Sequence, residues 1–384
     1  MKIGVIGAGR LGICFALLCE AAGYDVLVSD IREDYVSQLN ERKIDTNEPE
    51  VDNLLRQAKN FRATTNNKEV IDECDLIYTL VATPSLTDGS YDVSSVWDVV
   101  EEFSDVTEKK YFVVGCTVNP GDCKKFKEKI PNNVKIFYNP EFIAQGTIIN
   151  DLRNADMVLL GYDINESIDN PVVKDIRKLY ERIQTTRAIV CTMTTTAAEI
   201  TKIAVNCFLT TKISYANMLG DVLTMAGCGD EVTGVLGAIG ADTRIGRRYL
   251  NYGLGYGGPC LPRDNRAFAA FAKGLGMKYN LGFVTDAINN EHAEFVCNYY
   301  EKMNPNKPFY FDYIAYKKGT DILTESQQYR LCKDLLERGR VVYIQNDRKV
   351  VEQIYDSLTE KYGNRVKFVD KKENITEPIF IVKL

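Results

Sequence analysis

Cys260 is the residue whose surroundings most favour nucleophilic chemistry. It stands in residues 255–264, Gly-Tyr-Gly-Gly-Pro-Cys-Leu-Pro-Arg-Asp, a glycine-rich turn with a proline where the first turn of a helix would begin. A thiol at the start of a helix is close to the positive end of the helix dipole, which favours the thiolate. The segment therefore predicts a cysteine nucleophile that attacks a carbonyl carbon, with Asp264 one helical turn further on.

The other cysteines and the histidine content limit which chemistry is available. The 11 cysteines are spread over the chain, odd in number and never spaced Cys-x-x-Cys, so we expect reduced thiols and no disulfide framework. With His292 as the sole histidine, the sequence offers neither a histidine-rich metal site nor a Ser-His relay. Cysteine, lysine and carboxylate side chains must carry the reaction, and no metal is predicted.

Two further groups of polar residues have spacings that suit a ligand site. Glu199, Lys202 and Asn206 share one face of a long helix predicted over 194–226. Residues 139–142, Asn-Pro-Glu-Phe, follow an apolar strand and put a carboxylate near its carboxyl end, where ligands of open α/β sheets bind. From spacing alone a solvated polar face is the simpler interpretation of the first group, and the second is ambiguous.

The N-terminus carries a dinucleotide-binding pattern. A short apolar run over 2–6 ends in Gly-x-Gly-x-x-Gly at residues 7–12 and passes into a helical pattern, so backbone N–H groups can face a pyrophosphate. Asp30, at the end of the second predicted strand, is placed to accept ribose hydroxyls and to repel a 2'-phosphate. NAD is therefore predicted, and Arg32 keeps NADP as a lesser alternative.

The strands and helices that must position these residues are predicted to form an α/β fold. Apolar runs at 25–29, 76–82, 111–115, 135–138 and 157–161 alternate with charged segments of helical length, which predicts a parallel sheet with helices on both faces. A helix over 263–273 is expected after the glycine-rich loop. A second, small α/β domain is expected beyond residue 304, with strands at 309–315, 341–345, 366–369 and 379–382 and a helix at 325–337.

Length and charge narrow the class of protein. A chain of 384 residues with 45% hydrophobic residues exceeds what one core supports, so two or three domains are expected. The net charge of -6, with basic residues scattered among acids, argues against nucleic acid as a partner. No apolar stretch reaches the roughly 18 residues of a membrane span and no signal peptide is seen, so we expect a cytoplasmic protein.

Together these segments resemble the UDP-glucose and GDP-mannose dehydrogenase family. The matching motifs follow in order over nearly the whole chain: Gly-x-Gly-x-x-Gly at 7–12, Thr83-Pro84, Cys116-Thr117-Val118, residues 139–142, Glu199-x-x-Lys202-x-x-x-Asn206, Gly-Ala-Asp-Thr-Arg at 240–244, and Gly-Gly-Pro-Cys-Leu-Pro-Arg-Asp at 257–264. The resemblance implies an N-terminal Rossmann-type, doubly wound NAD-binding domain over 1–192 and a central helical dimerisation domain over 193–295 that carries the cysteine. It also implies a shortened C-terminal α/β domain over 296–384 that binds the nucleotide sugar.

The resemblance implies that the sugar C6 alcohol is oxidised twice to a carboxylate, with two NAD consumed. The substrate that it favours is UDP-glucose, which would give UDP-glucuronate for polysaccharide biosynthesis. Cys260 would form a thiohemiacetal and then a thioester. Lys202 and Asn206 would stabilise the oxyanion, Glu141 and Asp264 would handle the proton and the hydrolytic water, and Thr117 would orient that water.

The resemblance also implies binding residues and a homodimer through the central helix. The residues implied for NAD are Gly7, Gly9, Arg10, Leu11, Gly12, Asp30, Thr83, Pro84 and Thr117. Those implied for the nucleotide sugar are Phe142, Ile143, Gln145, Lys202, Asn206, Arg244, Tyr249, Leu250, Tyr256, Gly257 and Lys317, with Arg244 reaching the nucleotide of the neighbouring subunit.

Three departures from the family pattern leave alternatives open. Gln145 stands where the family has a second glutamate, Thr324 replaces an arginine that contacts NAD, and the chain stops at Leu384 before the family's last segment. GDP-mannose is an alternative substrate, whereas 2-acetamido sugars are disfavoured because their dehydrogenases lack Asn-Pro-Glu-Phe. A nucleotide-sugar-binding protein with little turnover is an alternative from another class, and a 2-hydroxy-acid dehydrogenase is weaker because it needs no cysteine nucleophile.

Overall fold

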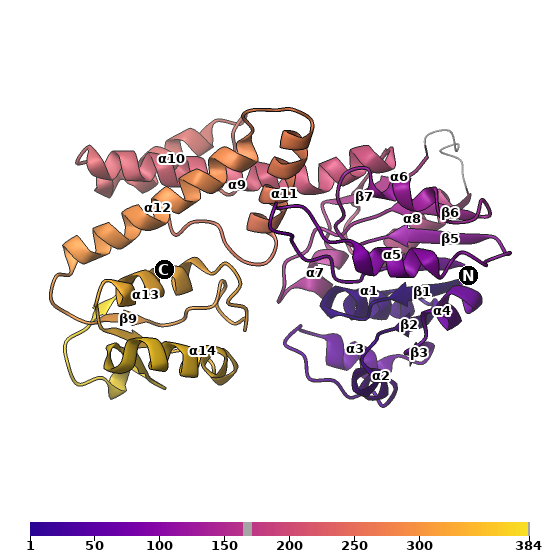
Figure 1. Ribbon diagram of the computed structural model, residues 1–384, viewed down its shortest axis with the longest axis horizontal. Helices are drawn as coiled ribbons and strands as arrows, with labels where there is room; N and C mark the ends of the chain where they lie inside the picture. The colour runs from indigo at the N-terminus through magenta and orange to yellow at the C-terminus, as the bar shows by residue number, and fades with distance from the viewer. Residues whose placement is uncertain (164–170, 383–384) are drawn as a thin grey trace. The chain divides into compact units, whose positions relative to one another are not determined.

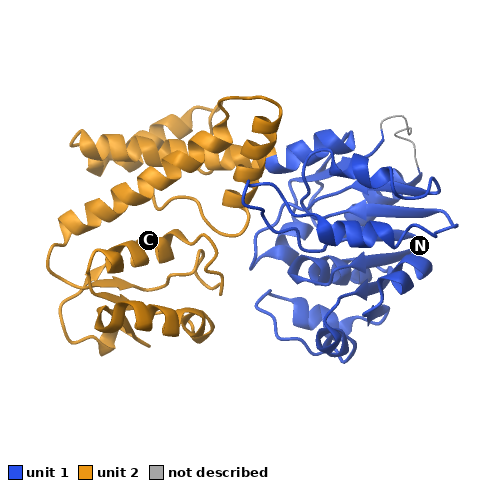
Figure 2. Ribbon diagram, in the orientation of Figure 1, with its two compact units in different colours: residues 1–203 blue, residues 204–384 orange. Residues whose placement is uncertain are grey.

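The structure is a computed structural model that describes residues 1–163 and 171–382 (Figure 1). Two compact units divide the chain, Met1–Ile203 and Ala204–Leu384 (Figure 2). The boundary falls inside the long helix α9 (Thr195–Met225), so this helix belongs to both units. The three domains expected over 1–192, 193–295 and 296–384 stay a prediction.

Unit 1 is built on an eight-stranded sheet with the order β3-β2-β1-β4-β5-β6-β7-β8. The strands are β1 (Lys2–Ile6), β2 (Asp25–Ser29), β3 (Phe61–Thr64), β4 (Leu76–Thr79), β5 (Lys110–Val114), β6 (Val134–Tyr138), β7 (Met157–Gly161) and β8 (Ile189–Met193). Strands β1 to β6 are parallel, which confirms the Rossmann-type sheet. The sheet departs from parallel pairing at one edge, where β7 pairs antiparallel with β6 and β8 runs parallel to β7. A local apolar run predicts a strand but does not give its direction.

Helices cover both faces of this sheet (Figure 1). They are α1 (Arg10–Ala21), α2 (Glu33–Asn40), α3 (Val51–Gln57), α4 (Asn67–Glu73), α5 (Ser94–Glu101), α6 (Asp122–Lys127), α7 (Ile148–Arg153) and α8 (Pro171–Ile183). Neighbouring residues of β1 enter different cores: Val5 packs in the cluster with α1, and Ile6 in the cluster with α4 and α5. The alternation of side chains along a strand therefore produces a doubly covered sheet.

Unit 2 combines helices with a smaller sheet. Its helices are the remainder of α9, α10 (Val232–Ala241), α11 (Leu261–Gly274), α12 (Leu281–Met303), α13 (Gln327–Glu337) and α14 (Arg348–Tyr362). The sheet is parallel with the order β11-β10-β9-β12, formed by β9 (Phe309–Phe311), β10 (Val342–Ile344), β11 (Val366–Phe368) and β12 (Phe380–Ile381). The second α/β sheet is confirmed, with strands shorter than predicted. The long helix predicted over 194–226 is confirmed to within one residue at each end.

Across residues 1–163 and 171–382, none of the helices has both the length and the apolar character needed to span a membrane.

Candidate active site

The glycine-rich turn between β1 and α1 leaves room for a ligand at only one of its three glycines. Gly7 has φ +95°, and a Cβ there would lie 2.9 Å from the backbone of Leu80. A Cβ on Gly12 would lie 1.9 Å from the carbonyl oxygen of Gly7, so α1 packs directly against the turn. A Cβ on Gly9 would meet nothing within 4 Å, and Gly9 has no side-chain cap for α1. The open space at the helix N-terminus fits the pyrophosphate of a dinucleotide.

Asp30 lies at the end of β2, as predicted, and is held by a neighbour. Its carboxylate accepts hydrogen bonds from the backbone N–H of Arg32 at 3.1 Å and from Nε and Nη2 of the same residue at 2.8 and 2.9 Å. The side-chain bonds to Asp30 raise the pKa of the Arg32 guanidinium, which also lies 4.1 Å from the ring centroid of Tyr35. Arg32 is therefore already engaged by Asp30, so the observation that kept NADP open loses weight.

Glu141 follows β6 and belongs to a chain of hydrogen bonds. The hydroxyl of Tyr180 contacts both the carboxyl of Glu141 and Oδ1 of Asn139, the latter at 2.8 Å. One hydroxyl hydrogen cannot serve both acceptors, so the arrangement is fully bonded when Glu141 is protonated and donates to Tyr180. Removal of the Glu141 carboxyl from water raises its pKa to about 7, against the opposing influence of Tyr180 and Lys202. Glu141 is thus a carboxyl that can hold or release a proton near neutral pH.

On the polar face of α9, Glu199 and Lys202 are buried and Asn206 is half-buried, which corrects the interpretation of this face as a solvated stripe. The Lys202 ammonium donates to the main-chain oxygen of Glu141 at 2.7 Å and lies 4.5 Å from the ring centroid of Phe142. Glu199 is fully buried and accepts from the backbone N–H of Cys123 at 2.8 Å and from that of Gly121, at the start of α6. The structure therefore brings Lys202 to the Asn-Pro-Glu-Phe segment, whereas Glu199 stabilises a neighbouring helix end.

The loop after Glu141 lies against the dinucleotide turn. Oε1 of Gln145 accepts from Nη1 of Arg10 at 3.0 Å. Buried Glu48 accepts from the backbone N–H of Gly146 at 2.6 Å and of Ile148 at 3.3 Å, which fixes the loop. The residue that departs from the family pattern thus contacts the turn predicted to hold the cofactor.

Two loops at the carboxyl ends of the central strands are joined by a buried bond. The hydroxyl of Thr83, after β4, donates to the main-chain oxygen of Thr117, after β5, at 2.7 Å. The main-chain oxygen of Pro84 accepts from the N–H of Asp92 at 2.8 Å. The segments predicted to contact NAD are therefore fixed to one another at the edge where ligands of such sheets bind.

Cys260 caps the N-terminus of α11, where the sequence placed it. The thiol residue is partly buried, and its carbonyl oxygen accepts the first helical bond from the N–H of Asp264 at 2.9 Å. The carboxylate of Asp264 is 1% exposed and accepts from Nδ2 of Asn206 on α9 at 2.6 Å. Unit 2 therefore gathers three predicted residues, Cys260, Asp264 and Asn206, around one helix start.

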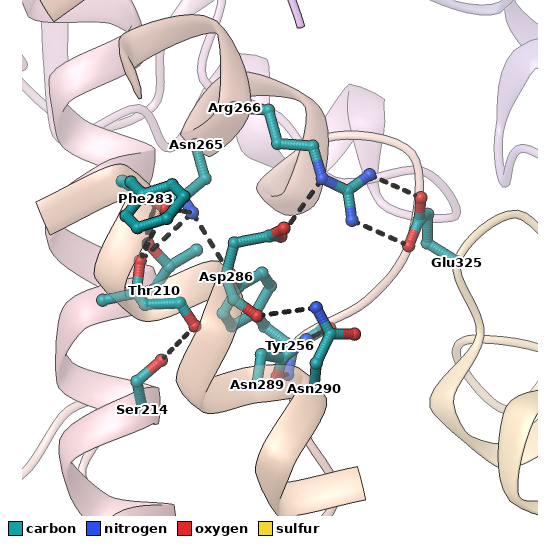
Figure 3. Close-up of polar contacts among 12 residues, drawn as sticks. Thr210, Ser214, Tyr256, Asn265, Arg266, Phe283, Asp286, Asn289, Asn290 and Glu325 are labelled. Atoms are coloured by element: carbon teal, nitrogen blue, oxygen red, sulfur yellow. Dashed lines mark hydrogen bonds and ion pairs between the residues drawn. The ribbon is translucent and has the colours of Figure 1, made fainter. Parts of the chain in front are cut away.

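The loop that leads to Cys260 is held by close backbone packing. A Cβ on Gly257 would lie 2.2 Å from the carbonyl oxygen of Glu325, and one on Gly258, with φ +81°, would lie 2.5 Å from the Tyr316 ring. Tyr256 is buried and its hydroxyl accepts from Nδ2 of Asn265 at 3.1 Å (Figure 3). Only glycine fits the two positions before Pro259.

Other residues predicted to bind the nucleotide sugar are spread over unit 2. Arg244 is 87% exposed and pairs with Asp242. Tyr249 is exposed with φ +62°, whereas the side chain of Leu250 packs in a small apolar cluster with Ala216 and Leu236. Lys317 is exposed. The binding roles of Arg244, Tyr249, Leu250 and Lys317 stay predictions, as do those of Ile143 and Leu11, which pack against the core of unit 1.

His292 forms a buried network that sequence reasoning missed. Its Nδ1 lies 2.7 Å from a carboxylate oxygen of Asp221, and its Nε2 lies 2.7 Å from the carbonyl oxygen of Gly253. Each ring nitrogen therefore contacts an oxygen from a different segment of the chain. The hydroxyl of Tyr252 donates to the other oxygen of Asp221 at 2.8 Å. Because these partners are distant in sequence from His292, no local pattern marks the network.

Comparison with known proteins identifies the family of this chain. The sequence model of the UDP-glucose/GDP-mannose dehydrogenase family, NAD binding domain, matches residues 1–184, and that of the family's central domain matches residues 196–291. The chain belongs to the UDP-glucose/GDP-mannose dehydrogenase family. It is an oxidoreductase that uses NAD and acts on a nucleotide sugar.

Individual relatives agree with this family. A UDP-glucose 6-dehydrogenase of Haloferax volcanii is 28% identical over 356 residues, 88% of this chain and 81% of that protein. The structure of a UDP-glucose dehydrogenase from Pyrobaculum islandicum has a TM-score of 0.86 at 26% identity and covers 99% of this chain and 89% of that one. A UDP-D-ManNAc dehydrogenase from Pyrococcus horikoshii shares the fold, with a TM-score of 0.75 at 21% identity, 99% of this chain and 97% of that one.

Proposed function

We propose that this chain oxidises the C6 alcohol of UDP-glucose to the carboxylate of UDP-glucuronate through a thioester on Cys260. The observation that carries this proposal is the placement of Cys260 at the start of α11, beside a buried Asp264 that is bonded to Asn206. An alcohol dehydrogenase that stops at the aldehyde needs no nucleophile, whereas a route to the acid gains a tractable intermediate from a thiolate.

In the first half of the reaction, the sugar hydroxyl loses its proton to a carboxylate and becomes an aldehyde. The β1–α1 turn would hold NAD, which would supply the hydride acceptor for both oxidations. The Cys260 thiolate then adds to the aldehyde carbon and forms a thiohemiacetal, whose oxygen carries developing negative charge. Lys202 and Asn206, four residues apart on the continuous helix α9, supply an ammonium and an amide N–H to that oxygen.

In the second half, the thiohemiacetal is oxidised to a thioester and water hydrolyses it. Water attacks the thioester carbon, the C–S bond breaks, and the sulfur leaves as the Cys260 thiolate. We assign the proton transfer from this water to Glu141, because its pKa of about 7 lets it accept and release a proton at neutral pH. Asp264 keeps Asn206 oriented, and Thr117 is the group proposed to hold the water.

The substrate is proposed from the relatives. The Haloferax volcanii and Pyrobaculum islandicum proteins are named for UDP-glucose, and both cover most of this chain. The test is a panel of UDP-glucose, GDP-mannose and UDP-N-acetyl sugars with NAD, followed by NADH absorbance and by mass spectrometry of the product. Two NADH per UDP-glucuronate would support the proposal. Faster turnover of GDP-mannose than of UDP-glucose would make GDP-mannose the substrate. Binding of a nucleotide sugar without formation of NADH would favour a protein that has lost turnover.

We also propose a homodimer through α9. Five large apolar side chains lie along this helix at heptad-like spacing and are 41–70% exposed: Phe208, Tyr215, Met218, Val222 and Met225. An apolar seam of this kind on a long helix can pair with its own copy about a two-fold axis, because such an interface uses the same surface twice. A dimer by analytical ultracentrifugation that becomes a monomer in Val222→Glu would support the interface, and a monomeric wild-type chain would reject it.

A further inference from the structure

The geometry points to Asn289 of α12 as a positioning residue for Cys260, an inference that rests on the proposed role of Cys260 as the nucleophile. Asn289 acts on Cys260 through the loop that precedes it. It fixes the backbone of Tyr256, four residues before Cys260, and thereby the loop from which α11 begins.

The side-chain amide of Asn289 bonds the Tyr256 backbone on both sides. Its Oδ1 accepts from the N–H of Tyr256 at 2.9 Å, and its Nδ2 donates to the carbonyl oxygen of the same residue at 3.1 Å (Figure 3). Nε2 of Gln327 donates to that carbonyl oxygen as well, at 3.1 Å. Asn289 is 7% exposed, so a lost bond would leave a polar backbone group without water. The Asn289 side chain thus satisfies both backbone polar groups of Tyr256, as a neighbouring strand does in a sheet.

Gly255 is required by this arrangement. A Cβ on Gly255 would lie 2.1 Å from Oδ1 of Asn289 and 3.0 Å from its Cγ. The contact involves the end of one side chain, so shortening Asn289 would remove the obstacle. Gly255 and Asn289 therefore form a matched pair, and a change in one should alter the cost of a change in the other.

The two Asn289–Tyr256 hydrogen bonds, here called the clamp, are linked to α11 through the Tyr256 side chain. The Tyr256 hydroxyl accepts from Nδ2 of Asn265, and Oδ1 of Asn265 accepts from the hydroxyl of Thr210 on α9 at 2.8 Å (Figure 3). Asn265 is fully buried and directly follows Asp264. The same residue that Asn289 holds by its backbone is therefore bonded to the first turns of the helix that Cys260 caps.

The test compares Asn289→Ala with Asn290→Ala in the full chain. Asn290 is the next residue of α12, but it is exposed and its amide bonds Asp286 within the helix and Arg330. In Asn289→Ala we expect amide hydrogen exchange over residues 253–258 to quicken roughly tenfold, because two buried hydrogen bonds are lost. The kcat should fall roughly tenfold, with a smaller change in KM and unchanged affinity for NAD. Asn290→Ala should match the wild type in each measurement.

A readout without turnover separates this inference from the proposed function. Alkylation of Cys260 by iodoacetamide, measured relative to the exposed Cys228 in the same sample, should slow about threefold in Asn289→Ala because the thiol leaves its place at the helix end. If the wild type oxidises no nucleotide sugar but alkylation slows, the proposed function fails and the positioning role stands. Unchanged exchange, or faster exchange with unchanged kcat and alkylation, would overturn the positioning role.

The matched pair gives a second test that does not depend on one variant folding well. Gly255→Ala alone should lower the thermal midpoint strongly, because its methyl group would collide with Asn289. Adding Asn289→Ala should cost less in the double variant than in the wild type. Additive effects would show that the two residues do not act together and would overturn the clamp.

Discussion

In unit 1 the Glu141 carboxyl is bonded to a tyrosine hydroxyl, whereas in unit 2 the Asp264 carboxylate is bonded to the amide of Asn206. The first partner is a hydroxyl, which can both donate and accept a hydrogen bond and which also contacts Oδ1 of Asn139. Burial raises the pKa of Glu141 to about 7. The second partner has no proton to exchange, and Asp264 is buried with fixed hydrogen bonds. From this difference we propose a division of roles, in which unit 1 supplies the group that exchanges protons and unit 2 holds the thiol in place.

Removal of the thiol should break this division most severely. Cys260→Ala should lower the rate of acid formation by roughly a thousandfold or more, because no covalent intermediate can form. Affinity for NAD, a property of unit 1, should be unchanged by calorimetry. Cys260→Ser should give a slow adduct that intact-mass spectrometry detects. Full activity in Cys260→Ala would refute the thioester route.

Removal of the proton acceptor in unit 1 should have the next largest effect. In Glu141→Gln, hydrolysis of the thioester should slow roughly a hundredfold, so a burst of NADH would precede accumulation of the acyl-enzyme. The wild-type hydrolytic rate should rise with pH through about 7, as Glu141 loses its proton, and this limb should vanish in the variant. Single-turnover kinetics with intact-mass detection measures both. Steady turnover without a burst would transfer the base role to Asp264.

The Glu141 carboxyl should make stability fall with rising pH, whereas it should make the hydrolytic rate rise. A carboxyl whose pKa is raised from 4.5 to about 7 on folding binds more protons in the folded state between these values. Its stabilising contribution is therefore complete below pH 4.5 and is lost as the pH rises through about 7. Denaturant unfolding should show that Glu141→Gln loses less stability than the wild type between pH 5 and pH 8, roughly the window set by this pKa. Parallel pH profiles would contradict the raised pKa.

Asp30→Ala should have a moderate effect on the cofactor alone. Loss of the carboxylate should weaken NAD binding roughly tenfold and release Arg32 toward the 2'-phosphate of NADP, so that discrimination between the two falls. Asp34→Ala, an exposed carboxylate in the first turn of α2, is the control and should change neither affinity. Titration of both cofactors by fluorescence checks the result. An unaltered preference for NAD would show that Asp30 is not the ribose contact.

Gln145→Glu should have the smallest effect, because the new carboxylate would pair with Arg10, to which the amide is already bonded. We expect rates within about threefold of the wild type, with the hydrolytic half altered more than the first hydride transfer. Gln145→Ala should mainly raise KM. Pre-steady-state measurement of both halves would show it, and a large change confined to the first hydride transfer would contradict the assignment.

The sequence predicted those features that depend on neighbouring residues. The strand, glycine turn and helix at residues 2–21 follow from local spacing, and so do the length of α9 and the place of Cys260 at a helix start. Each is set by steric limits and hydrogen bonding within a few residues.

Features set by distant pairing were not predictable in this way. The reversed direction of β7 is decided by its partner strand, which no local pattern identifies. The burial of Glu199 depends on N–H groups more than seventy residues earlier, and the bonds from Asn289 to Tyr256 join residues separated by 33 positions. The spacing of side chains on α9 predicted which residues share a face, but only tertiary packing shows that Glu199 and Lys202 on that face are buried.

The lone histidine makes this enzyme its own spectroscopic reporter. Selective isotope labelling of histidine would place one imidazole signal in the whole chain, from the ring between Asp221 and Gly253. Its two ring nitrogens would report separately on α9, through Asp221, and on the loop at Gly253, since each nitrogen faces a different partner. Magnetic resonance could thus follow the Cys260 loop during turnover without an attached probe.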